Sequence, residues 1–299
     1  MDSNLLPGDP LAITLSGDFG EIGGGVTPDT RASVDGSQSL SLYFARRDKS
    51  TSGNTWPSYG TTALSGTRTA GSGNQTITFS TTQYYPMEKA FGNTSSTSYN
   101  ETRFIGWFPQ AASFSGNIVK INVDGVNDIM LSNEVTGSYT SQFTSSQNQL
   151  AFSHQLTKVS VQVKAADTQA PTMWGTVTAI KVKNQPTTCD ITLPTTGNAV
   201  VGWTGSTALL SLEGMSTKTL TTSYQSCGTA LVKPTTDKNL TLEVTTSKGG
   251  ARDVTVSLAS GTFAAGTAYT ISLDFKSAII APSASVTAWG TGSNVNSDL

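Results

Sequence analysis

The sequence predicts an all-β fold arranged as two tandem β-sandwich domains. Apolar and polar residues alternate in short runs along the whole chain, whereas the spacing typical of helices hardly appears. Ser and Thr together exceed a quarter of the residues, and there are 29 glycines; these residue types favour strands and the turns between them. The length of 299 residues is enough for two domains that each bury a core.

In the first half, five runs of alternating apolar residues predict strands. In the first run, Leu11, Ile13 and Leu15 share one face. The five runs cover residues 11–15, 38–47, 75–86, 102–110 and 117–125. Stretches rich in Ser, Thr, Gly and Asn lie between them and are expected to be surface loops. These stretches are residues 50–54, 66–74 and 92–100.

A segment rich in Ser, Gln and Thr at residues 138–149 separates the two halves. We place the domain boundary there, so that the first domain covers 1–147 and the second covers 148–299. Eight further runs predict the strands of the second sandwich, and the run 239–259 predicts a hairpin. The runs lie at residues 150–165, 176–185, 189–194, 207–214, 228–234, 239–259, 266–277 and 283–290.

The charge of the chain excludes broad classes of partner. Charged residues make up 13% and the formal net charge is −2, so no general attraction to nucleic acid or to anionic membranes is expected. No apolar stretch is long enough to span a bilayer as a helix. The opening residues show no signal peptide, and one is expected to have been removed from an exported protein. The composition is typical of a secreted or surface-exposed protein.

The two cysteines, Cys189 and Cys227, share no metal-ligand spacing with each other or with the single histidine, so no metal site is predicted. Two interpretations stay open for them. They form one disulfide in an oxidising compartment, or they are two small buried apolar side chains.

His154 is the first candidate for a catalytic residue. Its parity matches that of Phe152 and Leu156, so its side chain is expected to face the core. An odd spacing before Val159 predicts a bulge near Thr157. A catalytic histidine needs an orienting acid and a nucleophile, and the sequence proposes neither. We therefore expect a hydrogen-bonded structural histidine and no catalytic residue.

The segment after residue 123 superficially resembles a calcium loop, because Asp124 and Asp128 have a suitable spacing. Val126 occupies a position that needs an oxygen ligand, and the bidentate glutamate is missing. A turn followed by a strand is therefore expected. The glycine-rich loop near residues 18–25 lacks the Lys-Ser/Thr pair and the helix of a phosphate site. No cofactor and no enzymatic activity are predicted.

Several phrases, taken in order along the chain, resemble the fimbrillins, which are subunits of type V pili and related surface lipoproteins of the Bacteroidetes. The early landmarks are TRAS at 30–33, QYYP at 83–86, FIGWFP at 104–109 and NDIMLSNEV at 127–135. The later ones are LAFSHQLTKVSVQV, with Phe152 and His154 as family markers, and the closing strands that end at Trp289. Each phrase is weak alone, and their order makes the resemblance specific.

The resemblance implies two transthyretin-like β-sandwich domains and a place at the cell surface, in a pilus at the outer membrane. Fimbrillins are exported as lipoproteins whose mature N-terminal cysteine is acylated. This sequence has no cysteine there, so a lipid anchor is an expectation only.

The resemblance also implies assembly by donor-strand exchange. An Arg-specific protease removes the first strand, and a strand of a neighbouring subunit fills the groove. The removable strand would contain Leu11, Ile13 and Leu15, and Arg31 would be the processing site. Arg46 and Arg47 are lesser candidates. The expected partners are other pilus subunits, the protease and a host or bacterial surface ligand.

The leading hypothesis is therefore a structural or adhesive pilus subunit. After Trp289 the sequence lacks alternating apolar residues, so either residues 278–289 serve as a donor or this subunit donates no strand. The alternatives are a non-polymerising surface lipoprotein and a carbohydrate-binding module. The second alternative would use Trp56, Tyr59 and Trp203 as sugar-stacking side chains.

Overall fold

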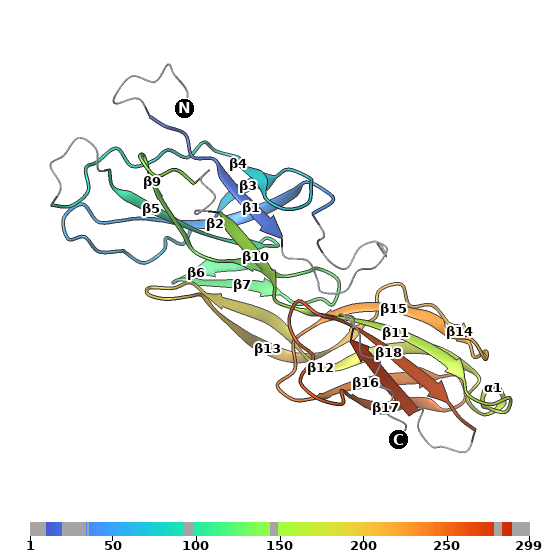
Figure 1. The fold of residues 1–299 in the computed structure, drawn as a ribbon. Coiled ribbons are helices and arrows are strands. Elements are labelled where there is room, and N and C mark those ends of the chain that lie inside the picture. The colour runs from blue at the N-terminus through green and yellow to red at the C-terminus, as the bar shows by residue number, and fades with distance from the viewer. Residues whose placement is uncertain are drawn as a thin grey trace.

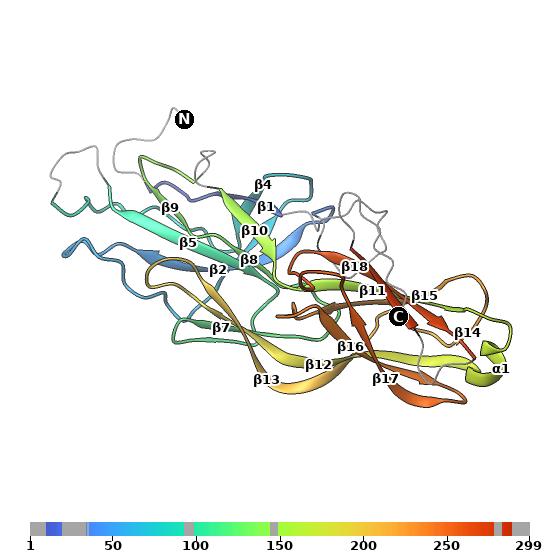
Figure 2. The ribbon, with the colours of Figure 1, turned by 60° about the horizontal axis from the view of Figure 1, so that its bottom comes forward.

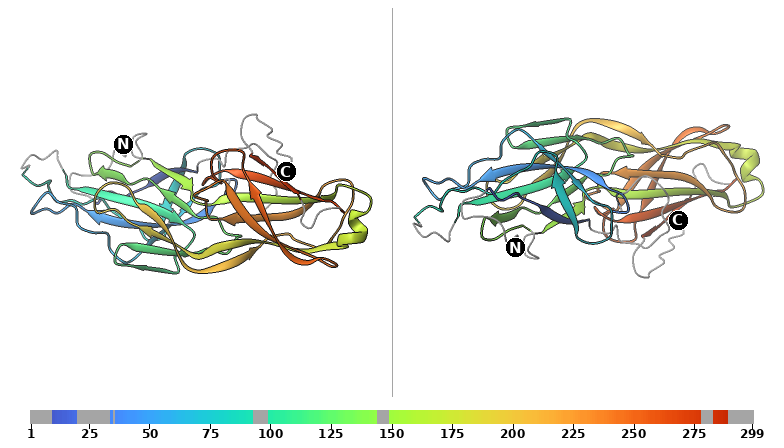
Figure 3. Two further views of the ribbon diagram at one scale, coloured as in Figure 1. Left: turned by 90° about the horizontal axis from the view of Figure 1, so that it is seen from below. Right: turned by 90° about the horizontal axis from the view of Figure 1, so that it is seen from above.

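A computed structural model describes residues 10–19, 34, 36–92, 99–143, 149–277 and 283–288. Within these ranges the chain forms nineteen strands and one short helix, α1 (Ala170–Trp174), so the predicted all-β class is confirmed. The molecule is elongated, and α1 lies at the end opposite the first sheet (Figure 1 and Figure 3). The description of the two halves as transthyretin-like sandwiches stays a prediction.

The first sheet has eight strands in the order β2-β3-β4-β1-β10-β8-β5-β9. Its members are β1 (Leu15–Phe19), β2 (Leu40–Asp48), β3 (Leu64–Arg68), β4 (Gln75–Phe79), β5 (Glu101–Phe108), β8 (Met130–Ser132), β9 (Val135–Ser138) and β10 (Leu150–His154). A further pairing joins β2 to β5, so seven of the strands form a closed ring. The N-terminal strand β1 is one segment of that ring.

Two more sheets form the rest of the molecule. The second sheet has seven strands: β6 (Ser113–Ser115), β7 (Ile118–Asn122), β12 (Thr176–Thr192), β13 (Val200–Ser211), β14 (Lys218–Thr219), β16 (Asn239–Thr246) and β17 (Gly250–Ser257). The third sheet has the order β15-β11-β18-β19. Its strands are β11 (Thr157–Ala165), β15 (Gln225–Val232), β18 (Ala268–Phe275) and β19 (Ser283–Ala288).

Strand pairing crosses the predicted boundary at 147/148 in both directions. β10 follows the boundary but lies between β1 and β8 in the first sheet. β7 precedes the boundary but pairs with the C-terminal end of β12 in the second sheet. Figure 2 shows β7, β12 and β13 lying along one side of β2 and β5. The division into domains 1–147 and 148–299 stays a prediction, and it would separate these paired strands.

Three apolar clusters fill the molecule. One lies within the ring, one lies between the ring and β7, β12 and β13, and one lies between the second and third sheets. Alternate residues of β5 serve different clusters, because Phe104 belongs to the ring cluster whereas Ile105 and Trp107 belong to the second. Both faces of β5 are thus buried, which explains the nearly continuous apolar run in its sequence.

Three predicted elements differ from the observed ones. The regular part of the first strand is Leu15–Phe19 rather than 11–15, because the alternation continues through Gly17, whose lack of a side chain hides it in the sequence. The predicted loop 66–74 begins inside β3. The runs 176–185 and 189–194 are one strand, β12, whose pairing with β13 shifts register on either side of Pro186. The hairpin of β16 and β17 is confirmed.

Candidate functional site

The slot occupied by β1 is the candidate functional site. β1 pairs antiparallel with β4 through Leu15–Gly17 and parallel with β10 through Gly17–Phe19. Before the regular strand, the Ile13 amide donates to the Gln83 carbonyl at 2.7 Å, and the Tyr85 amide donates to the Leu11 carbonyl at 3.1 Å. Among the described strands, β1 is the only connection between β4 and β10.

The inward side chains of this segment belong to the ring cluster. Ile13, Leu15 and Phe19 are buried, and Leu11 packs against them from a partly buried position. Two predicted members of the removable strand, Ile13 and Leu15, therefore lie in the core as expected. The Phe19 ring meets the Phe152 ring of β10 edge-on, with centroids 5.5 Å apart and an angle of 84° between the planes.

Gly17 occupies the tightest point of the slot. A Cβ atom at this position would lie 2.9 Å from Ile77 Cδ1 and 3.2 Å from Phe152 Cε2. The same Phe152 ring would lie 2.9 Å from a Cβ at Gly106 of β5, on the other side of the ring cluster. The aromatic ring of the family marker thus fills space that two glycines leave open.

Arg68 closes one end of the slot and is 1% exposed. Its Nε donates to the Gly17 carbonyl at 3.0 Å, and its guanidinium carbon lies 4.1 Å from the centre of the Phe19 ring. The other guanidinium nitrogens donate to the carbonyls of Thr69, Gly71 and Gly73. Burial lowers the pKa of Arg68 from its ordinary value, and the nearby Asp18 carboxylate partly offsets this effect.

His154 faces inward, is 4% exposed, and has the hydrogen bond that was expected for a structural histidine. Its Nδ1 lies 2.5 Å from Asp128 Oδ2, an acid the sequence did not indicate. The Val34 amide also donates to Asp128 Oδ2, at 3.3 Å. Through this hydrogen bond the pair fixes the backbone at Val34, which lies three residues after Arg31. Leu156 and Thr157 are both buried, so the inward parity shifts before Val159 as expected. The predicted bulge near Thr157 is wrong, because the run 150–165 divides there into β10 and β11, which belong to different sheets, and the register shift of β11 lies between Val161 and Gln162.

The predicted processing sites have different positions. Arg31 lies outside the described residues. Arg46 and Arg47 lie within β2, which pairs with β3 and β5. Arg46 binds Asp48 and the Tyr84 carbonyl, and the Arg47 side chain is only 1% exposed. A protease needs an exposed segment, so Arg31 is the candidate we retain.

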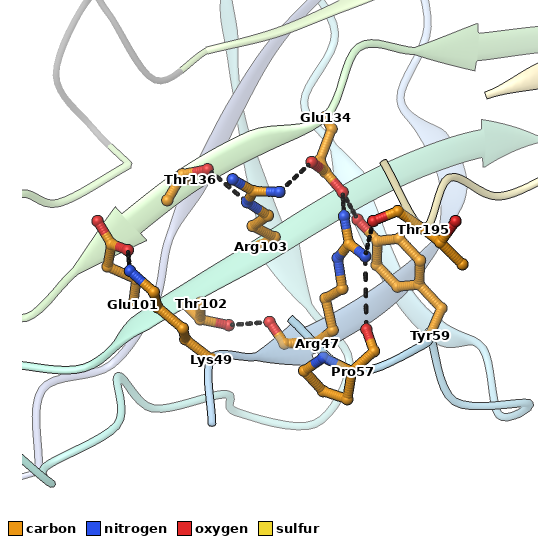
Figure 4. A network of polar contacts seen from close by, with 10 residues as sticks. All are labelled: Arg47, Lys49, Pro57, Tyr59, Glu101, Thr102, Arg103, Glu134, Thr136 and Thr195. Atoms are coloured by element: carbon orange, nitrogen blue, oxygen red, sulfur yellow. Dashed lines mark hydrogen bonds and ion pairs between the residues drawn. The ribbon is translucent and has the colours of Figure 1, made fainter. Parts of the chain in front are cut away.

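Arg47 belongs to a buried ionic cluster (Figure 4). Arg47 and Arg103, from the adjacent strands β2 and β5, converge on Glu134 with contacts of 2.5 and 3.0 Å. The Tyr59 hydroxyl donates to Glu134 at 2.5 Å, and burial and this carboxylate raise the pKa of Tyr59. Arg47 also donates to the carbonyl of Thr195, between β12 and β13, at 3.2 Å. The cluster thus ties the ring to the second sheet.

The three aromatic residues of the carbohydrate hypothesis do not form a common exposed surface. Tyr59 is buried and bonded to Glu134, and Trp203 packs against the second apolar cluster. Trp56 is partly exposed, but the guanidinium carbon of Arg103 lies over its ring, 3.9 Å from the ring centroid. All three therefore act as packed anchors of their own loops or strands.

Cys189 and Cys227 are free, buried thiols in different apolar clusters, which favours the second interpretation given above. Asp124 caps a turn by accepting from the amides of Val126 and Asn127, as expected. Among the described residues, no group of three His, Cys, Asp or Glu side chains could hold a metal ion. No described helix is long and apolar enough to cross a membrane.

The sequence did not indicate three contacts: that of Asp128 with His154, that of Arg68 with β1, and that of Glu134 with Arg47. The spacing of Asp128 suggests only a calcium ligand, and Arg68 lies in the stretch 66–74 that the sequence predicts to be a loop. Glu134 lies beside Asn133 in a landmark phrase, but its partner Arg47 is 87 residues away. No local signal identifies such contacts.

The chain was compared with known proteins. A family model described as fimbrillin-like matches residues 30–289. A solved structure of a candidate cell adhesion protein from Bacteroides uniformis has 18% identity and a TM-score of 0.57, with 94% of this chain and 98% of that chain covered. A second one, from Bacteroides ovatus, has 14% identity and a TM-score of 0.51, with 95% and 100% covered. No curated protein matches the sequence.

Proposed function

This chain belongs to the fimbrillin-like family, and we propose that it is a pilus subunit in which a strand of a neighbouring subunit replaces β1 after cleavage at Arg31. The family supports a role in a pilus or in adhesion at the cell surface, without catalysis. The exchange mechanism, the protease and the processing site are parts of the proposal.

The observation that carries the proposal is the position of β1 in the ring. The ring closes through the β2–β5 pairing, and β1 is its N-terminal segment. Loss of β1 would open the ring between β4 and β10 and leave unpaired main-chain groups on both strands. An open sheet edge beside apolar pockets binds an extended segment through main-chain hydrogen bonds and alternate side chains.

The energetic cost of losing β1 supplies the driving force. Ile13, Leu15 and Phe19 are each at most 7% exposed. Burial of one such side chain contributes roughly 1.5–3 kcal/mol, so their loss removes several kcal/mol. A typical domain is stable by only about 5–15 kcal/mol. A cleaved subunit would therefore be strongly destabilised until a donor strand fills the slot.

The linker from Phe19 to Arg31 is rich in glycine and contains Pro28, a composition that favours protease access. Val34, the first described residue after it, binds Asp128. The hydrogen bond would keep the new N-terminus of a cleaved chain beside the slot. Cleavage would then release β1 without releasing the segment that follows it.

The test is an Arg31→Gln variant in the cells that produce the protein. We expect the native chain in surface filaments, detected by immunoelectron microscopy, and the variant exported in equal amounts but absent from filaments. Arg252→Gln, at an exposed position of β17, is the matched control. Filaments that contain the Arg31→Gln chain at the native level would contradict the proposal. Absence of both chains from any filament would favour a non-polymerising surface protein.

A further inference from the structure

The β1 slot differs along its length in what it can accept. At the positions of Ile13 and Leu15 it buries large aliphatic side chains, and at the position of Phe19 it buries a ring. At the position of Gly17, between them, a side chain would require the terminal methyl of Ile77 and the ring of Phe152 to move. A segment that fills the slot must meet all four conditions at alternate residues, because side chains of a strand point to one face with a period of two.

The requirement for glycine is one of space. The φ of Gly17 does not lie in the left-handed region, so the backbone there is open to any residue. Only the neighbouring atoms exclude a side chain, and they approach from both adjoining strands: Ile77 belongs to β4 and Phe152 to β10. A valine would add three carbons at this point. Overpacking of that kind strains the core and weakens the binding of the strand, even where the surrounding side chains can shift.

The requirement for an aromatic residue comes from Arg68. Three carbonyls of its own loop, from Thr69, Gly71 and Gly73, hold the guanidinium in place independently of β1. The two remaining contacts, the Gly17 carbonyl and the Phe19 ring, belong to β1. When β1 leaves, Arg68 keeps its orientation and presents one N–H and one face of its plane to the empty slot. Such a preorganised group discriminates between ligands at little entropic cost.

We infer that the slot selects its donor strand by the pattern large apolar–x–large apolar–x–Gly–x–aromatic, with the glycine admitted between Ile77 and Phe152 and the aromatic ring recognised by Arg68. The inference rests on the proposed strand exchange and names the partner that it needs. Within the 299 residues this pattern occurs once, in β1 itself. Strand β19, Ser283–Ala288, contains neither a glycine nor an aromatic residue. The donor is therefore a strand that carries this pattern, and the closing strands of a second copy do not fit the slot.

The test uses the full chain with a site for a sequence-specific protease inserted between Gly24 and Gly25. After cleavage, confirmed by intact mass, no covalent link joins β1 to the rest of the chain. The chain is then incubated with an excess of a fluorescent peptide of residues 10–19, and uptake is followed by size exclusion. Four other peptides are compared: Gly17→Val, Phe19→Leu, the control Ala12→Val at an exposed position, and residues 278–289.

We expect uptake of the native and Ala12→Val peptides. Uptake of the Phe19→Leu peptide should be at least about tenfold weaker, and that of Gly17→Val at least about tenfold weaker too, since a tenfold change corresponds to about 1.4 kcal/mol. The peptide 278–289 should not bind. Equal uptake of native, Gly17→Val and Phe19→Leu peptides, or uptake of 278–289, would overturn the inference and leave strand exchange intact. Failure of the native peptide to enter would overturn strand exchange and the inference with it.

Discussion

The carboxylate of Asp128 lies 2.5 Å from Nδ1 of His154, and both side chains are almost completely buried. The histidine is the only one in the chain, and its partner is an acid placed 26 residues earlier. Asp128 Oδ2 also accepts from the Val34 amide, so the pair connects β10 with the chain that follows the linker. The pair therefore has a structural role at the point where the proposed processing would act.

Asp128→Asn tests this role. The asparagine cannot satisfy His154 and the Val34 amide in the same way, and an unsatisfied buried polar group costs about 1–3 kcal/mol. Urea unfolding should show a loss of stability in that range. Asp124→Asn is the matched control, because Asp124 is exposed and asparagine keeps the Oδ1 that accepts from the amides of Val126 and Asn127, so the change should be worth within about 0.5 kcal/mol. Equal midpoints for the two variants would contradict the structural role.

Glu134→Gln tests the ionic cluster. The change leaves Arg47, whose side chain is 1% exposed, without a compensating charge. Removing one partner of a buried ion pair destabilises by about 3–5 kcal/mol. The control is Glu101→Gln, which removes the acid of an exposed pair with Lys49 and should cost about 1 kcal/mol or less. Chemical denaturation of both variants measures the difference, which should vanish if the cluster contributes nothing.

Leu15→Ala tests the contribution of β1 to the ring. Leu15 is fully buried, and a leucine-to-alanine change in a core costs about 2–5 kcal/mol. Leu209→Ala, at a position that is 44% exposed, should stay within about 0.5 kcal/mol of the native chain. Thermal and urea unfolding of the intact chains give both values. A loss for Leu15→Ala no larger than that for Leu209→Ala would show that β1 is loosely held.

The buried thiols predict how stability depends on pH. Burial raises the pKa of Cys189 to about 12 and that of Cys227 to about 11. A folded thiol then keeps its proton where the unfolded one, with a pKa near 9.0, has lost it. The stabilisation is complete below pH 9 and is lost as the pH rises from 9 towards 11–12. Urea midpoints should fall across this window, and less so in a Cys189→Ala, Cys227→Ala chain; parallel curves would contradict the prediction.

Local patterns predicted much of this fold because most strands bury alternate residues. The inward position of His154 followed from its parity with Phe152, and the face shared by Ile13 and Leu15 followed in the same way. The partners of His154 and Arg47 could not be predicted, because they are brought together by strand pairing over long separations. Arg68 was missed for another reason: its acceptors are loop carbonyls, which any residue supplies.

Local sequence patterns also could not predict where some individual strands begin and end. β12 runs through Pro186, a residue that normally interrupts a central strand; at this position the pairing with β13 is irregular, and the other partners of β12 pair before or after it. β1 continues for four residues beyond Leu15, its last aliphatic side chain. The alternation is hidden there because position 17 is a glycine, and Ile77 and Phe152 crowd the space that a side chain would occupy. In both cases the cause lies in neighbouring strands, not in the segment itself.

The central claim is that β1 is a removable segment of the ring. The most direct test is digestion of the purified chain with an Arg-specific protease, followed by intact mass and size exclusion. We predict one early cut after Arg31, loss of residues 1–31 from the folded chain, and a lower midpoint of urea unfolding for the chain that remains. Resistance at Arg31, or a cut after which residues 1–31 stay bound to a monomer of unchanged stability, would contradict the claim and make β1 a permanent strand of the fold.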